Sequence, residues 1–376
     1  MTTLRKTILG LLLLLGLALL YLLFWPVPIQ PVAWQPPTDL GYAGAHAVNT
    51  RLAGLRKIDL HGEEGPEHVQ IGPDGRLYLA LASGKILRMG LDGGTQQVLA
   101  STGGRVLGFD FDATGHLIAA DAMRGLLSIA PDGQITLLTD RVGETPILYA
   151  NAVVVAKSGK IYLSDASMRF APRDWGGTFE ASVLDILEQS RTGRVLEYDP
   201  VSKGTRVVAR GLSFANGLAL SSDERSIYVN ETGQYRIWKV AVTAQKLDLA
   251  KLSNADAPQP NAEARVQFDN LPGYPDNLMR GLDGRIWVGL VKPRNPKVDQ
   301  LARKPWLRSL TLRLPRALWP IPVAYGHVFA FDETGRVVAD LQDPTGSYPE
   351  TTSVTETSDR LYVHSLHARE LGWLPR

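Results

Sequence analysis

Four polar residues stand at equivalent places in a repeated pattern along this chain of 376 residues. The pattern is a short strand of alternating apolar residues, a turn that carries Gly or Asp, and a second strand. Carboxylate and amide oxygens are the ligands that Ca²⁺ prefers, whereas zinc and copper favour imidazole and thiolate. The residues that form this set of hard-cation ligands are Glu67, Asn151, Asn216 and Asp276, with Asn277 beside the last.

The repeat predicts how these residues meet. Its six copies begin at residues 67, 108, 151, 216, 276 and 352, and the first three are 41 and 43 residues apart. That spacing is typical of a four-stranded propeller blade, and the longer spacings indicate insertions. We therefore predict an all-β fold, a six-bladed β-propeller whose inner strands converge on one axis. Residues at equivalent ends of those strands would meet there and bind Ca²⁺.

Two of these positions have alternatives. Taken alone, Asn216 followed by Gly217 is more typical of a turn than of a ligand, and only the repeat favours the metal. Glu64 competes with Glu67 for the ion. The position of Glu67 directly before the first strand favours Glu67.

Several residues could supply acid–base chemistry beside such an ion. Asp276 could both ligate the metal and assist a water molecule. Asp121 ends a second strand, where it is either a turn residue or an acid or base that lines the pocket. His364 and His367 titrate near neutral pH, although a histidine near a strand end is more often structural. The sequence has no Gly-x-Ser-x-Gly elbow and no cysteine, which disfavours a serine hydrolase and excludes a cysteine nucleophile.

Longer motifs around these residues resemble a known family. TGRVLEYDP (192–200), NGLALS (216–221) and YPDN (274–277) together resemble the strictosidine-synthase-like family, most of all its adipocyte plasma membrane-associated protein-like branch, over residues 55–374. That family is similar in turn to gluconolactonase/senescence marker protein and to paraoxonases. The resemblance implies a six-bladed propeller with a calcium ion in the central tunnel. The family's metal positions fall on the residues that the repeat had already selected.

The chain differs at two points from the families that it resembles, and both differences bear on its chemistry. It has no cysteine, so it lacks the disulfide of paraoxonases and plant strictosidine synthases. Thr351 or Thr352 aligns with the glutamate that strictosidine synthase uses, which disfavours amine condensation. We therefore expect a calcium-dependent hydrolase of lactones or aryl esters, in which activated water attacks a metal-bound carbonyl. The alternative is a non-catalytic propeller that calcium braces and that binds a ligand or partner.

The N-terminal segment predicts a membrane anchor. Arg5 and Lys6 precede an uncharged, Leu-rich run over residues 7–25 that is just long enough to span a bilayer. Basic residues before the span favour a cytoplasmic N-terminus and an exported propeller, periplasmic or luminal/extracellular. A cleaved signal peptide is the alternative. We expect an anchor over residues 1–25, a Pro-containing linker over 26–54 and the propeller over 55–376, with residues 56–60 closing the ring against C-terminal strands.

Two insertions interrupt the blades. In residues 168–191, Val183, Leu184 and Leu187 have helical spacing, and this short helix either caps the pocket or is a surface excursion. Residues 292–322 mix Arg and Lys with Trp and Leu, which is typical of an amphipathic element on a membrane surface or of a lid over the tunnel. The near-balance of 40 basic and 38 acidic residues, without a basic stripe, excludes a nucleic-acid partner. The expected partners are an ester or lactone substrate and the membrane.

Overall fold

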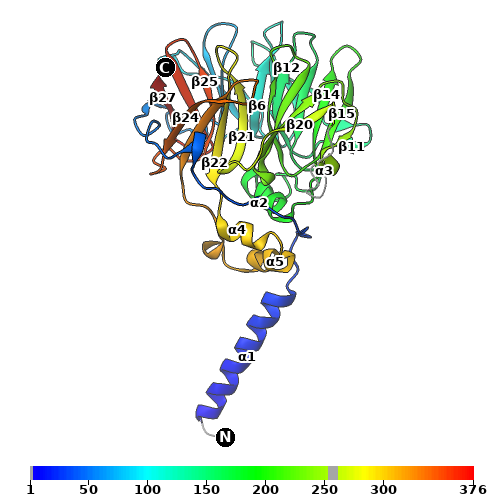
Figure 1. The fold of residues 1–376 in the computed structure, drawn as a ribbon, viewed down its shortest axis with the longest axis vertical. Coiled ribbons are helices and arrows are strands. Elements are labelled where there is room, and N and C mark those ends of the chain that lie inside the picture. The colour runs from blue at the N-terminus through cyan, green and yellow to red at the C-terminus, as the bar shows by residue number, and fades with distance from the viewer. Residues whose placement is uncertain (1–2, 253–260) are drawn as a thin grey trace.

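Six β-sheets surround a central axis in the computed structural model, which describes residues 3–252 and 261–376 (Figure 1). The first strands of the six sheets contact one another in a closed ring, in the order β2, β6, β12, β16, β21 and β25. Each predicted strand–turn–strand copy forms the first two strands of one blade. The predicted six-bladed β-propeller is therefore confirmed.

The blades are numbered in chain order. Blade one contains β2 (His68–Ile71), β3 (Leu77–Ala80), β4 (Lys85–Met89) and β5 (Gln97–Ser101), and blade two contains β6 (Val106–Phe111), β7 (Leu117–Asp121), β8 (Gly125–Ile129) and β9 (Ile135–Thr139). Blade three contains β12 (Ala150–Val155), β13 (Ile161–Asp165), β14 (Gly193–Asp199) and β15 (Gly204–Leu212), with β19 (Leu247–Asp248) beside β15. Blade four contains β16 (Ala215–Leu220), β17 (Ser226–Glu231), β18 (Arg236–Ala241) and β20 (Ala264–Phe268). Blade five contains β21 (Gly273–Arg280), β22 (Ile286–Pro293), β23 (Gly326–Phe331) and β24 (Val337–Asp343), and blade six contains β25 (Thr351–Glu356), β26 (Arg360–Ser365), β27 (Glu370–Pro375) and β1 (Arg56–Asp59). A small ribbon of β10 (Arg141–Val142) and β11 (Thr145–Pro146), the helix α3 (Leu249–Leu252) and the 3₁₀ turn η2 (Thr232–Gln234) complete the propeller.

The N-terminal strand β1 closes the ring. It pairs antiparallel with β27, with Arg56 opposite Trp373 and Ile58 opposite Leu371, which confirms the predicted pairing of residues 56–60. Ile58 and Leu371 then pack with Leu79 of blade one in one buried cluster. Pairing the last blade with the start of the propeller removes two free sheet edges without a disulfide.

The two insertions form helices on the face of the propeller that points toward the N-terminal helix α1 (Thr3–Phe24) (Figure 1). The first insertion contains α2 (Thr178–Glu188), as its apolar spacing predicts. The second insertion, residues 292–322, is called the lid and contains α4 (Pro296–Leu301), α5 (Pro305–Arg313) and the 3₁₀ turn η3 (Arg316–Leu318). Among the residues described, α1 is the helix that is long and apolar enough to cross a membrane.

The Pro-containing segment after α1 has little regular secondary structure, and it lies against the propeller. We call residues 26–49 the strap. Val32 N–H donates to the Glu188 carbonyl at 2.8 Å, and the Arg294 guanidinium donates to the Pro37 carbonyl at 2.8 Å. The strap thus crosses α2 and the lid before it reaches blade five.

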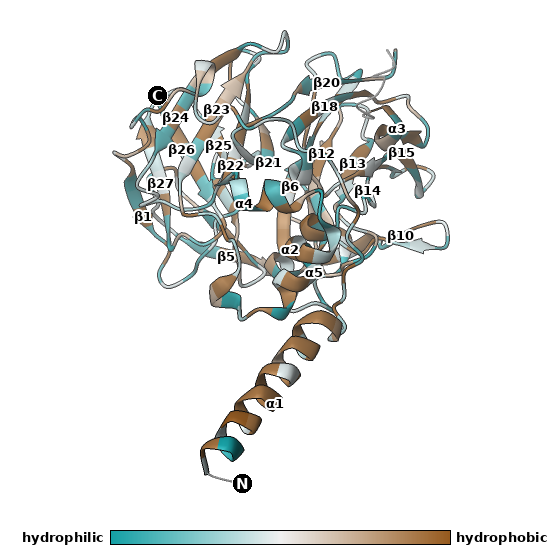
Figure 2. Cartoon of the chain, turned by 60° about the horizontal axis from the view of Figure 1, so that its bottom comes forward, coloured by the Kyte–Doolittle hydropathy of each residue, from teal (hydrophilic) through white to brown (hydrophobic). Residues whose placement is uncertain are grey.

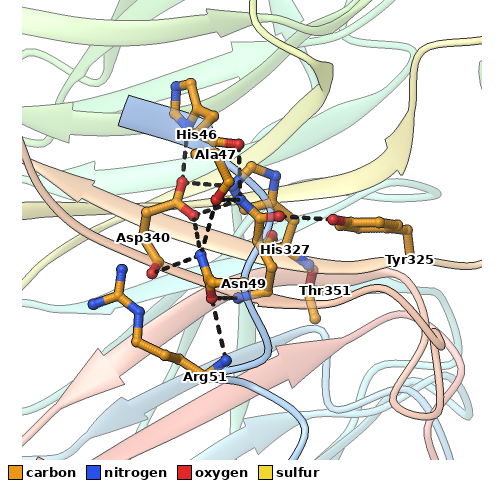
Figure 3. A network of polar contacts seen from close by, with 9 residues as sticks. His46, Ala47, Asn49, Arg51, Tyr325, His327, Asp340 and Thr351 are labelled. Carbon is orange, nitrogen blue, oxygen red and sulfur yellow. Dashed lines mark hydrogen bonds and ion pairs between the residues drawn. The ribbon is translucent and has the colours of Figure 1, made fainter. Parts of the chain in front are cut away.

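At blade five the strap is fastened by a polar network around Asp340, next to the 3₁₀ turn η1 (Gly44–His46) (Figure 3). His46 and His327 place ring nitrogens 2.7 and 2.8 Å from one oxygen of Asp340, and Asn49 donates to the other at 3.0 Å. Burial alone would raise the pKa of Asp340, but the hydrogen bonds from His327 and His46 hold this pKa well below its usual range. The network joins residues that are almost three hundred positions apart.

Ring closure can be tested by truncating Ile58. We expect Ile58→Ala to lower the free energy of unfolding by about 2–4 kcal/mol, because the side chain is buried between blades six and one. Lys57→Ala changes the neighbouring, exposed residue of the same strand and should change the free energy of unfolding by less than about 0.5 kcal/mol. Urea unfolding of the two variants measures both values. Equal effects would contradict a stabilising role for the β1–β27 closure.

Candidate metal centre and cavity

Three of the predicted ligands lie in β-bulges at the start of inner strands. The strand register shifts between Ala150 and Val153, between Ala215 and Leu218, and between Pro275 and Leu278, so Asn151, Asn216 and Asp276 fall inside the shifts. A bulge re-aims a side chain that would otherwise follow the alternation of the strand. The repeated bulge is therefore the local structure that brings these residues to the axis.

Gly217 follows Asn216 for a steric reason rather than to form a turn. A Cβ atom on Gly217 would lie 2.4 Å from the Leu278 nitrogen and 2.5 Å from the Asp276 carbonyl oxygen. The absence of a side chain lets β16 approach β21 closely. This contact also places the Asn216 amide nitrogen 2.8 Å from Asp276 Oδ1.

Glu67 is the residue directly before β2. Its carbonyl oxygen accepts hydrogen bonds from Asn277 Nδ2 at 3.2 Å and from Thr352 Oγ1 at 2.7 Å. Its carboxylate forms an ion pair with Arg105 at 2.5 Å. Asn277 thus positions the backbone of Glu67, while the Glu67 side chain faces the axis.

These residues share one cavity of about 390 Å³. Glu67, Asn151, Asn216 and Asp276, called the floor here, are each at most 5% exposed and all line it. Glu64 also lines the cavity, but its side chain is 45% exposed and lies near Arg369. The opposite wall is apolar and comes from α2 and the lid, including Val183, Ile186, Leu187, Trp319 and Ile321.

The floor has the electrostatics of a cation site. Burial raises the pKa of Glu67 and raises that of Asp276 well above its usual range, and for Asp276 the neighbouring charge of Glu67 adds to the effect. The Oδ1 atoms of Asn151 and Asn216 are buried and have no hydrogen-bond partner among the described residues. Two buried carboxylates with two unpaired amide oxygens fit a hard cation such as Ca²⁺, which would lower both pKa values by its charge. Arg105 competes for one oxygen of Glu67.

Asp121 does not line this cavity. Its Oδ1 accepts from the backbone N–H of Arg105 at 3.2 Å and of Met123 at 2.9 Å. Asp165 and Glu231, at the same place in blades three and four, accept from the N–H groups of Tyr149 and Ser213. In blades two, three and four the acid that ends the second strand therefore accepts hydrogen bonds from the backbone of the preceding loop, which favours a structural turn role for Asp121.

The two histidines have different surroundings. His364 is fully buried away from the cavity, where its Nε2 lies 2.8 Å from Thr355 Oγ1 and burial lowers its pKa well below the usual range. His367 lines the cavity, and its Nδ1 forms a short hydrogen bond with Glu350. This bond raises the pKa of His367.

Glu350 is a cavity residue that the sequence did not reveal. It directly precedes Thr351, one of the two threonines aligned with the glutamate of strictosidine synthase, so a carboxylate does lie beside that position. Burial would raise its pKa, but His367 and Lys292, whose Nζ is 2.6 Å away, lower it to about 2. Glu350 is therefore ionised at neutral pH. Arg105, Lys292 and Tyr149 also line the cavity and carried no signal in the sequence.

The structure has a second group of residues of the types that ligate metals, and this group lies in the strap network and not at the cavity. Its members are His46, His327 and Asp340. Its two imidazoles differ from the all-oxygen set that Ca²⁺ prefers. Both imidazoles are within hydrogen-bond distance of Asp340, so the group is accounted for as the fastening of the strap.

The fold and the cavity define the class of protein. A family model for the strictosidine synthase-like N-terminal region matches residues 44–89, and one for the SMP-30/gluconolactonase/LRE-like region matches residues 69–308. Protein STRICTOSIDINE SYNTHASE-LIKE 13 of Arabidopsis thaliana is 35% identical over 250 residues, which cover 65% of this chain and 57% of that protein. Adipocyte plasma membrane-associated protein of Salmo salar is 30% identical over 387 residues, which cover 96% of this chain and 86% of that protein. The chain therefore belongs to the strictosidine synthase-like family.

Solved structures share the fold at lower identity. A gluconolactonase of Xanthomonas campestris superposes with a TM-score of 0.58 and 20% identity, over 93% of this chain and 98% of that one. Regucalcin of Agrobacterium tumefaciens, a calcium-binding protein, superposes with a TM-score of 0.53 and 16% identity, over 82% of this chain and 85% of that one. Both likenesses support the propeller fold. They do not establish an activity, which has to be argued from the residues of the site.

Calcium binding to the floor can be tested by thermal unfolding of the full chain. We expect added Ca²⁺ to raise the melting temperature, with about 2.7 kcal/mol of stabilisation when the ion is at a hundred times its dissociation constant. Asp276→Asn and Glu67→Gln should abolish this response. Glu64→Gln, which changes the competing carboxylate at the cavity rim, should retain it. If Glu64→Gln abolished the response and Glu67→Gln retained it, the ion would be assigned to Glu64.

The raised carboxylate pKa values also predict how pH acts on the calcium-free protein. A group whose pKa is higher in the folded state contributes stability that is present at low pH and is lost as pH rises through the folded-state pKa. Chelated protein should therefore lose stability as pH rises above the ordinary carboxylate range, and saturating Ca²⁺ should remove the loss. Unfolding curves across pH, with and without chelator, measure this. The loss should also disappear in the double variant Glu67→Gln, Asp276→Asn, and a loss that persists there would have another origin.

Proposed function

We propose that the chain is a calcium-dependent hydrolase of lactones or aryl esters. The observation that carries this proposal is the pairing, in one cavity, of a cation-type floor with a His–Glu pair on the wall. A cation that only braces the blades would need the floor but not this pair. The family and its gluconolactonase-like fold agree with a hydrolase.

Glu67, Asp276 and the amide oxygens of Asn151 and Asn216 would hold the ion. Bound there, calcium supplies a Lewis acid that polarises a carbonyl oxygen and stabilises the negative charge developing on it. Asn277 and Thr352 keep the Glu67 backbone in place, and the ion pair with Arg105 orients the Glu67 carboxylate. The Nη1 group of Arg105 is buried and has no hydrogen-bond partner among the described residues.

His367 would act as the general base. With Nδ1 engaged by Glu350, its Nε2 remains free to take a proton from water as the water oxygen bonds to the carbonyl carbon. The same nitrogen then returns the proton to the alcohol oxygen when the carbon–oxygen bond breaks. A lactone gives a hydroxy acid, and an aryl ester gives a phenol and an acid. Glu350, kept ionised by Lys292, stabilises the imidazolium that forms between the two transfers.

The N-terminal helix supports a membrane location. At 22 residues α1 is long enough to cross a bilayer, and Arg5 and Lys6 at its start favour a cytoplasmic N-terminus with the propeller on the exported side. The relative named adipocyte plasma membrane-associated protein agrees with membrane association. We include this single-pass topology in the proposal.

The role of His367 predicts a characteristic pH dependence. Activity of the full chain on γ-lactones and phenyl acetate should fall about 10²–10⁴-fold in His367→Ala. In the unmodified protein activity should rise with pH through a pKa above the ordinary histidine value, because only neutral His367 accepts a proton and Glu350 raises its pKa. Glu350→Gln should shift this limb to lower pH. The measurement is kcat/KM against pH for each variant.

His61→Ala, which changes an exposed histidine outside the cavity, is the matched control and should leave the profile unchanged. A profile that does not move in Glu350→Gln would contradict the base assignment. Absence of turnover with any ester or lactone, together with a retained calcium-dependent melting shift, would favour the non-catalytic, calcium-braced propeller.

A further inference from the structure

The apolar wall of the cavity is also part of the outer surface. Ile321 lines the cavity and is 43% exposed. Trp319 and Pro322, its neighbours along the lid, line the same cavity. Residues 316–323, called the lid edge here, comprise the end of the lid and Val323 after it, and they combine apolar cavity lining with exposed apolar side chains.

This edge belongs to the part of the molecule that is joined to the membrane-type helix. Arg313, at the end of α5, donates from Nε to the Trp25 carbonyl at 2.6 Å and from Nη1 to the Leu22 carbonyl at 3.2 Å. Figures 1 and 2 both show α5 beside the C-terminal end of α1. If α1 spans a bilayer, α5 and the lid must lie at the bilayer surface on the propeller side.

The outer side of the lid has the composition that such a location requires. Four large apolar side chains there are from 43% to 84% exposed, namely Trp306, Leu318, Ile321 and Val323. Exposed basic residues lie among them, including Arg303, Lys304 and Arg316. Apolar side chains that enter the headgroup region, flanked by cations that attract anionic lipids, are characteristic of interfacial elements. Singly exposed apolar residues are common, but four of them within residues 306–323, a segment that adjoins a membrane-type helix, favour an interfacial role.

We propose that the lid lies in the bilayer surface and that the cavity takes its substrate directly from the membrane. The substrate class is an amphiphilic lactone or ester with an apolar chain. Its carbonyl group reaches the polar floor, and its chain lies against Val183, Ile186 and Ile321 on the apolar wall. The statement about the substrate depends on the proposed hydrolase function, whereas the statement about the lid does not.

Lid contact is tested without any activity. The full chain is reconstituted in vesicles of phosphatidylcholine and phosphatidylglycerol that carry bromine on the upper acyl carbons, and tryptophan quenching is measured. The quenched emission should fall in Trp306→Phe relative to the unmodified chain. It should not fall in Trp373→Phe, which removes a tryptophan on β27 of blade six, far along the chain from the lid. Equal quenching in all three proteins would overturn the lid placement.

Substrate delivery is tested with two lactones that share a ring and differ in the length of one alkyl chain. The double variant Leu318→Asp, Val323→Asp charges the lid edge outside the cavity and should reduce hydrolysis of the long-chain, vesicle-borne lactone by roughly tenfold. Hydrolysis of the short, water-soluble lactone should be unchanged, which also shows that the variant folds. Equal effects on both lactones, or none on either, would overturn delivery from the membrane.

The hydrolase function and the placement of the lid at the membrane can be refuted independently. If neither lactone is hydrolysed by the unmodified chain, the proposed function fails, while the quenching experiment still decides the position of the lid. If both lactones are hydrolysed at rates independent of chain length and of the lid charges, the hydrolase stands and membrane delivery is wrong.

Discussion

The burial of two carboxylates at the axis is the constraint on which the rest of the structure depends. Six inner strands meet in a ring, and three bulges turn polar side chains into the space that they enclose. Within the described residues Glu67 is paired with Arg105, whereas the Asp276 carboxylate receives only the Asn216 amide. A buried, weakly compensated carboxylate is costly unless it binds a cation or a proton. A cation or a proton bound at the floor would therefore affect both the stability of the ring and the chemistry of the cavity.

The three candidate functions make different demands on the cavity. A non-catalytic propeller that calcium braces would use the floor for the ion and the apolar wall for a bound ligand or partner, but it would have no need of the His367–Glu350 pair. Amine condensation requires a carboxylate free to handle protons on an amine, but Glu350 is already bound by Lys292 and His367 and is held ionised. Ester or lactone hydrolysis uses the floor, the pair and the wall together. The arrangement thus favours hydrolysis for chemical reasons that do not depend on the names of relatives.

The sequence predicted the fold well because a propeller repeats one simple pattern. Alternating apolar residues with a turn at regular spacing identify both inner strands of every blade, and the short strand at residues 56–60 is visible for the same reason. The sequence also selected the four floor residues, because equivalent positions in a repeat must converge. It could not show the bulges, since inserting one residue in a strand leaves the composition unchanged. Nor could it separate Asp121, which satisfies backbone groups, from a catalytic acid.

The residues that sequence reasoning missed come from places where the repeat gives no information. Arg105 precedes an inner strand, Lys292 lies where a blade passes into the lid, and Glu350 stands just before the weakest copy of the pattern. Each is an ordinary charged residue until the fold brings it against a buried partner. Placing Thr351 or Thr352 at the family's glutamate position also concealed Glu350, which stands one residue before β25 (Thr351–Glu356) and has left-handed backbone torsions rather than those of a strand.

The lid is attached unevenly, and this bears on where a substrate can enter. Arg308 is 2% exposed, and its guanidinium donates to the carbonyls of Leu187, Val32 and Ala302, so it fastens α2, the strap and the lid at one point. Burial lowers the pKa of Arg308 to about 10, which leaves it charged at neutral pH. Residues 316–323 are held differently. The backbone bonds found there in the described structure are local turns, Asn295 donates to the Pro320 carbonyl at 2.9 Å, and the more exposed Arg316 forms an ion pair with Glu180 of α2 at 3.1 Å. The lid is thus fastened through a buried guanidinium at α5, whereas residues 316–323, which carry exposed apolar side chains, are held by local turns and by more exposed contacts.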